Sequence, residues 1–214
     1  MKFNMKKAMI YDLDNTLYAV SDIGHELFAP LFDRIERSDN YNEDMEKIKK
    51  DLMRKPYQEV AEIYGFDEEL KRDGDDILKE LTYEKEIQVF EDYPAILELP
   101  GDRYLVTTGY TNMQNSKIRN MGISNDFKDL IVVDPSISDL TKMDVFSKIM
   151  KENGYQPSEM MVIGDDPDSE IKAAAELGIE SVLYHKLELT DHPHADYIIK
   201  DFRELASILT RQAP

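Results

Sequence analysis

Six short runs of the chain are apolar, most of them continuously, and each ends in a polar or glycine-rich turn. They are 7–13, 103–106, 130–133, 160–163, 181–184 and 197–199. Continuous apolar runs are expected for strands that are covered by helices on both faces. Apolar positions at helical spacing separate the later runs, and these helical segments are 113–121, 142–152, 169–177 and 202–211. The alternation predicts an α/β fold with a doubly wound, Rossmann-like parallel sheet.

Residues 18–93 follow a different pattern. Apolar residues recur at every fourth position from Ile23 to Ile35, and similar helical stripes follow with no clear strand among them. This stretch interrupts the alternation directly after the first predicted strand. We therefore predict a Rossmann-like core made of residues 1–17 and 94–214, with an inserted all-α domain folded beside the sheet.

Composition narrows the class of protein. The 214 residues are 42% hydrophobic and carry a formal net charge of −18. This charge disfavours nucleic acid as a partner, because phosphate backbones are bound by clustered lysine and arginine. No apolar stretch approaches the roughly 20 residues of a membrane helix, so no membrane association is expected. The chain has no cysteine, which excludes disulfides and fits a cytoplasmic protein. We expect either a monomer or a homodimer.

Acidic and hydroxyl side chains follow the first predicted strand. Asp12, Asp14 and Thr16 alternate along the sequence Asp-Leu-Asp-Asn-Thr just after the apolar run. In a parallel sheet, ligands bind beyond the carboxyl ends of the strands. Clustered carboxylates at that edge are costly unless a cation or a proton joins them. The pattern predicts a functional site there.

Three later segments put polar groups at the same edge of the predicted sheet. Thr107, Thr108 and Gly109 follow the second run, Lys142 begins the helix after the third, and Gly164 leads into Asp165 and Asp166 after the fourth. The carboxyl ends of parallel strands meet at one edge, so these distant positions can converge. Thr107 and Lys142 are assigned to the phosphoryl oxygens of a substrate, and Thr16, Thr108 and Gly109 are further candidates for phosphate binding.

Carboxylates suit a hard cation such as Mg²⁺, which keeps waters and takes substrate phosphate oxygens to complete its coordination. We assign Asp12, Asp14, Asp165 and Asp166 as candidate metal ligands, and Asp165 is preferred over Asp166 as the direct ligand because it follows the glycine. A second carboxylate two residues from a nucleophile can serve as general acid and base, a role that Asp14 could fill for Asp12.

The combined motifs resemble those of the haloacid dehalogenase superfamily. Asp12-Leu13-Asp14-Asn15-Thr16 is similar to its first motif, Thr107 to its second, Lys142 to its third and Gly164-Asp165 to its fourth. Lys142 lies 23 positions before Asp165, where the third-motif lysine is expected. The helical insertion falls where that family has its cap. Glu170 stands where aspartate is commoner in the fourth motif.

The resemblance implies a phosphoric monoester hydrolase in which Asp12 is phosphorylated and Asp14 is the general acid and base. Dehalogenases of the superfamily lack a counterpart of Asp14, so phosphoryl transfer is favoured. We predict a magnesium-dependent phosphatase for a small phosphorylated metabolite, of the nucleotide or sugar phosphate class, and the segment 12–18 looks 5′-nucleotidase-like. The alternatives are a phosphomutase of the same superfamily and a phospho-acceptor module without turnover.

Overall fold

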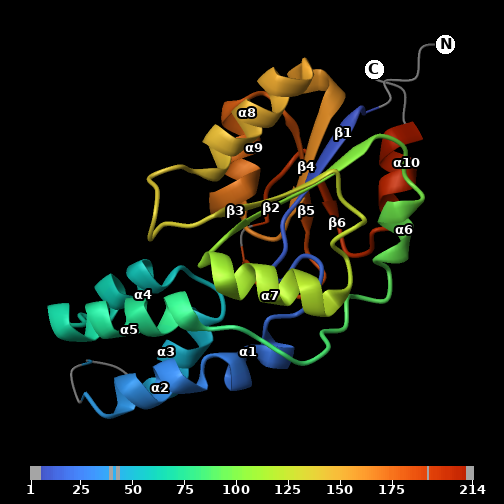
Figure 1. The fold of residues 1–214 in the computed structure, drawn as a ribbon. Coiled ribbons are helices and arrows are strands. Elements are labelled where there is room, and N and C mark those ends of the chain that lie inside the picture. Colours follow the sequence, from blue (N-terminus) through green and yellow to red (C-terminus); the bar gives the residue numbers. More distant parts are fainter. Residues whose placement is uncertain (1–5, 39–40, 42–43, 192, 211–214) are drawn as a thin grey trace.

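The computed structural model describes residues 6–38, 41, 44–191 and 193–210. Its centre is a six-stranded parallel sheet in the order β3-β2-β1-β4-β5-β6 (Figure 1). The strands are β1 (Ala8–Tyr11), β2 (Asp102–Thr108), β3 (Asp129–Val133), β4 (Met160–Gly164), β5 (Glu180–Tyr184) and β6 (Tyr197–Ile199). The predicted α/β fold with a Rossmann-like parallel sheet is confirmed.

Strand β1 lies in the middle of the sheet. Tyr11 pairs with Leu105 of β2 on one side and with Ile163 of β4 on the other. The amide of Asp12 then donates to the carbonyl of Ile163 at 3.0 Å, which extends the pairing by one residue. The register therefore brings the ends of three strands, and the polar residues that follow them, to one edge.

Both faces of the sheet are covered. On one face, Ile10 belongs to a buried cluster with Phe146 of α8 (Lys142–Asn153) and Ala174 of α9 (Lys172–Glu176). On the other face, Met9 packs in a cluster that includes Leu205 of α10 (Glu204–Thr210) and residues of α7 (Thr111–Met121). The short helix α6 (Pro94–Leu97) leads into β2. Side chains alternate between the faces along β1, which explains the continuous apolar run.

Of the helices that the structure describes between β1 and β2, all but α6 form a separate group beside the carboxyl edge of the sheet (Figure 1). They are α1 (Ser21–Leu27), α2 (Ala29–Glu36), α3 (Met45–Leu52), α4 (Tyr57–Ile63) and α5 (Glu68–Glu80). We call them the cap helices. These helices pack together because each has an apolar stripe that must be buried. Leu31 and Leu70, for example, are fully buried. The domain limits at 18 and 94 stay a prediction.

The helix predicted after β4 differs from the one observed. A wide turn of π-helix (Pro167–Ile171) comes first, and the α-helical part is the short α9. The turn is closed by the amide of Ile171, which donates to the carbonyl of Asp166. π-helical turns are found frequently at functional sites. The C-terminal helix begins at Glu204 rather than 202, and its predicted last residue, 211, lies outside the described residues. In the described part of the chain, no helix is both long and apolar enough to cross a membrane.

A buried carboxylate anchors the chain where it returns from the cap helices to the core. Asp92 is 2% exposed and accepts hydrogen bonds from the Tyr184 hydroxyl at 2.8 Å, the Phe202 amide at 2.8 Å and Lys186 Nζ at 3.2 Å. A buried carboxylate is tolerated only when such donors compensate it. Asp92 therefore ties the returning segment to β5 and to the start of the C-terminal region.

We expect Asp92→Ala to lower the free energy of unfolding by about 3 kcal/mol, because it leaves buried donors without an acceptor. Urea unfolding followed by circular dichroism measures this change. Glu91→Ala is the matched control, since Glu91 is an exposed partner of the same Lys186 and its loss should change stability little. Equal effects of the two substitutions would contradict the anchoring role.

Candidate active site

Asp12, Lys142 and Glu170 meet at the carboxyl edge of the sheet. Lys142 Nζ lies 2.6 Å from Asp12 Oδ1 and 2.7 Å from Glu170 Oε2, and all three side chains are less than 10% exposed. Lys142 begins α8, where Thr141 and Asp144 form a capping box that fixes the start of the helix. The two carboxylates raise the pKa of Lys142 against the opposing effect of burial, so the lysine is charged. The predicted convergence of Asp12 and Lys142 is observed.

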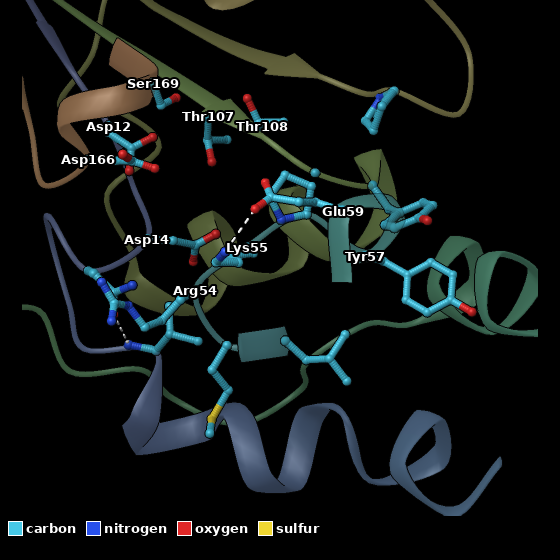
Figure 2. A pocket seen from close by; sticks show the side chains of 18 of the residues that line it. Asp12, Asp14, Arg54, Lys55, Tyr57, Glu59, Thr107, Thr108, Asp166 and Ser169 are labelled. Atoms are coloured by element: carbon cyan, nitrogen blue, oxygen red, sulfur yellow. Dashed lines mark hydrogen bonds and ion pairs between the residues drawn. The ribbon is translucent and has the colours of Figure 1, made fainter. Parts of the chain in front are cut away.

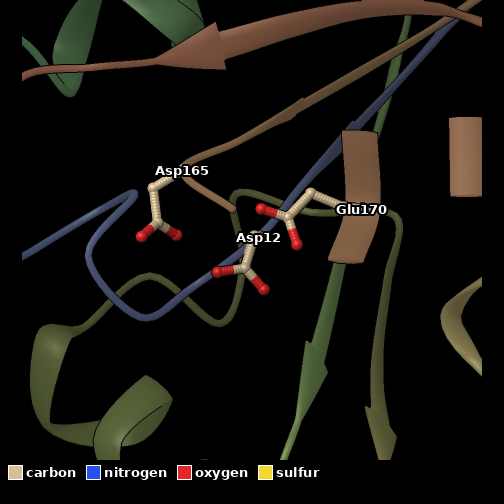
Figure 3. Close-up of side chains that lie close together, drawn as sticks. All are labelled: Asp12, Asp165 and Glu170. Carbon is tan, nitrogen blue, oxygen red and sulfur yellow. The ribbon is translucent and has the colours of Figure 1, made fainter. Parts of the chain in front are cut away.

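Three carboxylates at this edge form a candidate metal site (Figure 3). Asp12, Asp165 and Glu170 each have one carboxylate oxygen within 4.8 Å of those of the other two. Among the described residues, this is the group whose spacing suits a cation. Burial raises the pKa of Asp12 to about 7, with the charge of Glu170 adding to the shift and Lys142 opposing it. Burial and Glu170 also raise the pKa of Asp165. The site therefore carries more negative charge than Lys142 balances, and its hard oxygen donors fit Mg²⁺.

Asp14 lines the same pocket but has a separate set of partners. Lys117 Nζ lies 2.9 Å from its Oδ1 and 3.1 Å from its Oδ2, Tyr18 donates its hydroxyl to Oδ1, and Gln114 Nε2 donates to Oδ2 at 2.8 Å. Burial opposes ionisation, but Lys117 and these hydrogen bonds lower the pKa of Asp14. Asn15 takes a left-handed conformation with φ of 59° and turns the chain here. The Asp14 carboxylate lies outside the group of three that could hold a cation, and its predicted role as a metal ligand stays a prediction.

The predicted phosphate-binding residues have different positions. Thr107, Thr108 and Gly109 line the pocket in front of Asp12. The Thr107 hydroxyl accepts a hydrogen bond from Gln114 Nε2 at 2.6 Å, and the Gly109 amide donates to the carbonyl of Val133.

Thr16 is fully buried, and its hydroxyl donates to Asp165 Oδ1 at 3.2 Å. It therefore supports Asp165 from behind, and this geometry does not support the predicted phosphate contact of Thr16.

Asp166 lines the pocket but lies outside the group of three carboxylates. Its carboxylate accepts a hydrogen bond from the Asp168 amide at 2.9 Å and caps the wide turn, while its own amide donates to Glu170 Oε1 at 2.8 Å. The turn thus directs Glu170 back toward Lys142 and leaves Asp166 at the rim. Of the two aspartates after Gly164, the preferred Asp165 is the one that joins the group of three carboxylates, whose third member is Glu170. Asp166 as a metal ligand stays a prediction.

A pocket of about 340 Å³ connects this edge with the cap helices, and Figure 2 shows its side chains. Arg54 and Lys55, from the turn between α3 and α4, lie across the pocket from Asp12 (Figure 2). The Arg54 guanidinium donates to the carbonyl of Leu189, on the core side. This contact joins the cap to the core above the acidic cluster.

A second contact between cap and core lies at Tyr110, the residue before α7. Its hydroxyl donates to Asp75 of α5, and Gln58 of α4 donates to the same hydroxyl at 2.9 Å. Because Tyr110 directly follows Gly109 of the pocket wall, the cap is joined to the core beside the site. Such contacts can exclude water from a closed site.

Glu170, Lys117 and Gln114 were not predicted as site residues from the sequence. Glu170 had a sequence signal, since it belongs to the acidic segment after β4. Lys117 and Gln114 had none that could be separated from an ordinary helix surface. They are three residues apart on α7, so they lie on one face of the helix, and that face is buried against Asp14.

Two relatives of known name match nearly the whole chain. A glyceraldehyde 3-phosphate phosphatase of Methanocaldococcus jannaschii is 26% identical, with 96% of this chain and 97% of the relative covered. A protein of the same name from Methanopyrus kandleri is 24% identical, with 98% and 99% covered.

Solved structures share the fold at low identity. A haloacid dehalogenase-like hydrolase from Streptococcus pneumoniae has a TM-score of 0.72 and 20% identity over 95% of this chain and 98% of its own. The hydrolase YfnB from Bacillus subtilis, described as bound to magnesium and as revealing interdomain movement, has a TM-score of 0.68 and 18% identity over 97% and 100%. Residues 9–184, most of the chain, match the family described as haloacid dehalogenase-like hydrolase. With the four motifs brought to one edge of the sheet, the chain is a hydrolase that belongs to this family.

Proposed function

We propose that this protein is a magnesium-dependent phosphatase of a small sugar phosphate, with glyceraldehyde 3-phosphate as the first candidate. The observation that carries the proposal is the contact of Asp12 with Lys142 beside a second, partly buried aspartate, Asp14, on the same pocket. Relatives that cover the chain from end to end and bear the name glyceraldehyde 3-phosphate phosphatase support the substrate class.

The reaction has two halves. In the first, a carboxylate oxygen of Asp12 forms a bond to phosphorus, the bond from phosphorus to the leaving oxygen breaks, and Asp14 gives that oxygen a proton. In the second, water attacks phosphorus and gives its proton to Asp14. The bond between Asp12 and phosphorus then breaks, inorganic phosphate leaves, and both aspartates are restored.

The protonation of Asp14 fits the second half directly. Lys117 and two further donors keep Asp14 ionised in the substrate-free site, so that it can accept a proton from water. A phosphate dianion that enters beside Asp14 raises its pKa through like charge, which favours the protonated form that the first half requires.

Positive charge and hydrogen bonds stabilise the phosphoryl group in transfer. Lys142 and Thr107 line the pocket beside Asp12 and can hold phosphoryl oxygens. Mg²⁺ would be held by Asp12, Asp165 and Glu170 and would neutralise phosphoryl oxygens when bound.

The size of the pocket supports a small substrate. Its volume of about 340 Å³ lies at the lower end of the usual range for ligand sites. A triose phosphate has few atoms beyond its phosphate, whereas a nucleotide must also place a ribose and a base. The sugar phosphate class is therefore favoured over the nucleotide class.

Phosphate release from glyceraldehyde 3-phosphate, AMP and p-nitrophenyl phosphate tests the proposal, with Mg²⁺ or with EDTA. We expect phosphate release in the presence of Mg²⁺ and none in EDTA, and a higher kcat/KM for the triose phosphate than for AMP. A sugar phosphate isomer that accumulates without free phosphate would indicate the phosphomutase alternative instead. A stable phosphoprotein that releases no phosphate would indicate the phospho-acceptor alternative.

We expect Asp165→Asn to raise the Mg²⁺ concentration for half-maximal activity about 10- to 100-fold, because it removes one anionic ligand from the cluster. Phosphate release across a Mg²⁺ titration measures this shift. Asp168→Asn is the matched control, since Asp168 is an exposed carboxylate that lines the same pocket outside the cluster. An unchanged half-maximal concentration for Asp165→Asn would remove Asp165 from the metal site.

A further inference from the structure

One turn of α7 lies beneath Asp14 with two polar side chains that are almost completely buried. Lys117 is 1% exposed and Gln114 is 0% exposed. Lysine is almost never fully buried unless it is paired, and the partner of Lys117 is Asp14. The helix thus places a cation and an amide against the aspartate that the proposed reaction uses as acid and base.

The contacts of Asp14 occupy both of its carboxylate oxygens. Oδ1 receives the Tyr18 hydroxyl and Lys117 Nζ, and Oδ2 receives Gln114 Nε2 and Lys117 Nζ. The carboxylate plane is therefore fixed by donors on both sides. Lys117 is the donor that touches both oxygens, so its removal leaves each oxygen with one donor and loosens the carboxylate.

Gln114 joins Asp14 to the wall that faces the phosphoryl group. Its Nε2 donates to Asp14 Oδ2, to Thr107 Oγ1 at 2.6 Å and toward the Thr108 carbonyl at 3.4 Å. Its buried Oε1, in contrast, has no hydrogen-bond partner among the described residues. With the amide reversed, Oε1 would face Asp14 Oδ2 and the Thr108 carbonyl, which are both acceptors. The site therefore sets the orientation of the amide, and Oε1 is left unpaired.

An unpaired buried acceptor costs free energy, about 1 to 3 kcal/mol for a group of this kind. A side chain that served stability alone would satisfy both ends of its amide or would be apolar. The unpaired Oε1 therefore indicates that Gln114 is used for what its Nε2 does at Asp14 and Thr107. This observation is independent of the ion pair of Lys117, and both lead to the same aspartate.

We propose that Lys117 and Gln114 are positioning residues of the reaction, which hold the Asp14 carboxylate in the direction that proton transfer requires. The proposal rests on the proposed function, because it assigns the geometry of Asp14 to the two halves of phosphoryl transfer. Both residues act through Asp14, and Gln114 also orients the hydroxyl of Thr107.

Two substrates separate this role from a structural one. An alkyl phosphate such as glyceraldehyde 3-phosphate needs a proton on its leaving oxygen, whereas p-nitrophenolate leaves without one. In Lys117→Met, kcat for the alkyl phosphate should fall about 10- to 100-fold, the usual cost of losing a supporting contact to a site residue. With p-nitrophenyl phosphate, the first half should stay fast and the second should become limiting. Rapid mixing should then show a burst close to one p-nitrophenolate per protein.

Chemical rescue and a matched lysine complete the test. Lys117→Ala should regain activity with n-propylammonium, which replaces the missing atoms, and should not regain it with 1-propanol. Lys6→Met is the control, because Lys6 is also a buried, ion-paired lysine but lies at the other edge of the sheet with Glu180. It should lower Tm and leave kcat for both substrates unchanged.

Gln114→Met provides a second variant that does not depend on the fold surviving the loss of a buried charge. It removes the unpaired Oε1, so Tm should stay equal or rise while kcat for the alkyl phosphate falls. Lys117 and Gln114 variants that retain wild-type kcat, or that lose both substrates in proportion without a burst, would overturn the inference alone. A wild-type protein that releases no phosphate would overturn the proposed function and this inference with it.

Discussion

Asp12→Asn should abolish phosphate release, with kcat at least about 10⁴-fold below that of the wild type, because an amide cannot attack phosphorus as a carboxylate does. Asparagine has nearly the same shape and keeps an oxygen that can accept from Lys142, so the fold should survive. Phosphate release from glyceraldehyde 3-phosphate measures the loss, and incubation with a ³²P-labelled phosphate monoester should label the wild type and leave the variant unlabelled.

Asp166→Asn is the matched control for this substitution. Asp166 is another carboxylate on the pocket wall, and its contacts serve the wide turn rather than the cluster. Its replacement should reduce kcat far less than Asp12→Asn. An Asp12→Asn variant within about tenfold of the wild type would show that the covalent step does not use Asp12.

The sheet and its edge could be predicted because two physical constraints act on the sequence at once. Strands buried on both faces must be continuously apolar, and the strand ends of a parallel sheet meet at one edge. Asp12 and Asp165 directly follow such strands and Thr107 lies at the end of one, so their convergence required no knowledge of the loops. Lys142 begins the helix that follows a third strand. Each is found at that edge.

The directions of side chains after a strand could not be predicted in the same way. Asp14 is two residues from Asp12 and would share its face in an extended chain. Hydrogen bonds from Gln114 and Lys117 hold it against α7 instead. In the same manner, the wide turn sends Glu170 rather than Asp166 toward Lys142.

Buried polar residues on helices were the hardest to foresee. The exposed face of a helix and a polar face that is buried against a site carry the same residue types. Lys117 and Gln114 differ from solvated residues only through Asp14, whose position depends on a turn about a hundred residues earlier. Sequence reasoning finds such residues only after the site has been located by other means.

Lys142→Met should reduce kcat about 10²- to 10³-fold, because it removes the cation that contacts Asp12 and that can stabilise phosphoryl charge. Without Mg²⁺ it should also lower the free energy of unfolding by about 3 to 5 kcal/mol, the usual cost of removing one partner of a buried ion pair. Kinetics with glyceraldehyde 3-phosphate and urea unfolding in EDTA measure the two effects.

The stability of this variant should depend on Mg²⁺ more strongly than that of the wild type. Lys142 competes with a metal ion for oxygens of Asp12 and Glu170 and repels it, so a site without the lysine should bind Mg²⁺ more tightly. A ligand that binds only the folded state stabilises it by an amount that grows with the logarithm of the ratio of ligand concentration to Kd. Tighter Mg²⁺ binding therefore gives a larger rise in Tm. Lys6→Met, with its ion pair far from the cluster, should show the same Mg²⁺ response as the wild type. If Mg²⁺ raised the Tm of Lys142→Met no more than that of the wild type, Lys142 and the metal would not share the carboxylates, and the assignment of Asp12 and Glu170 as ligands would be wrong.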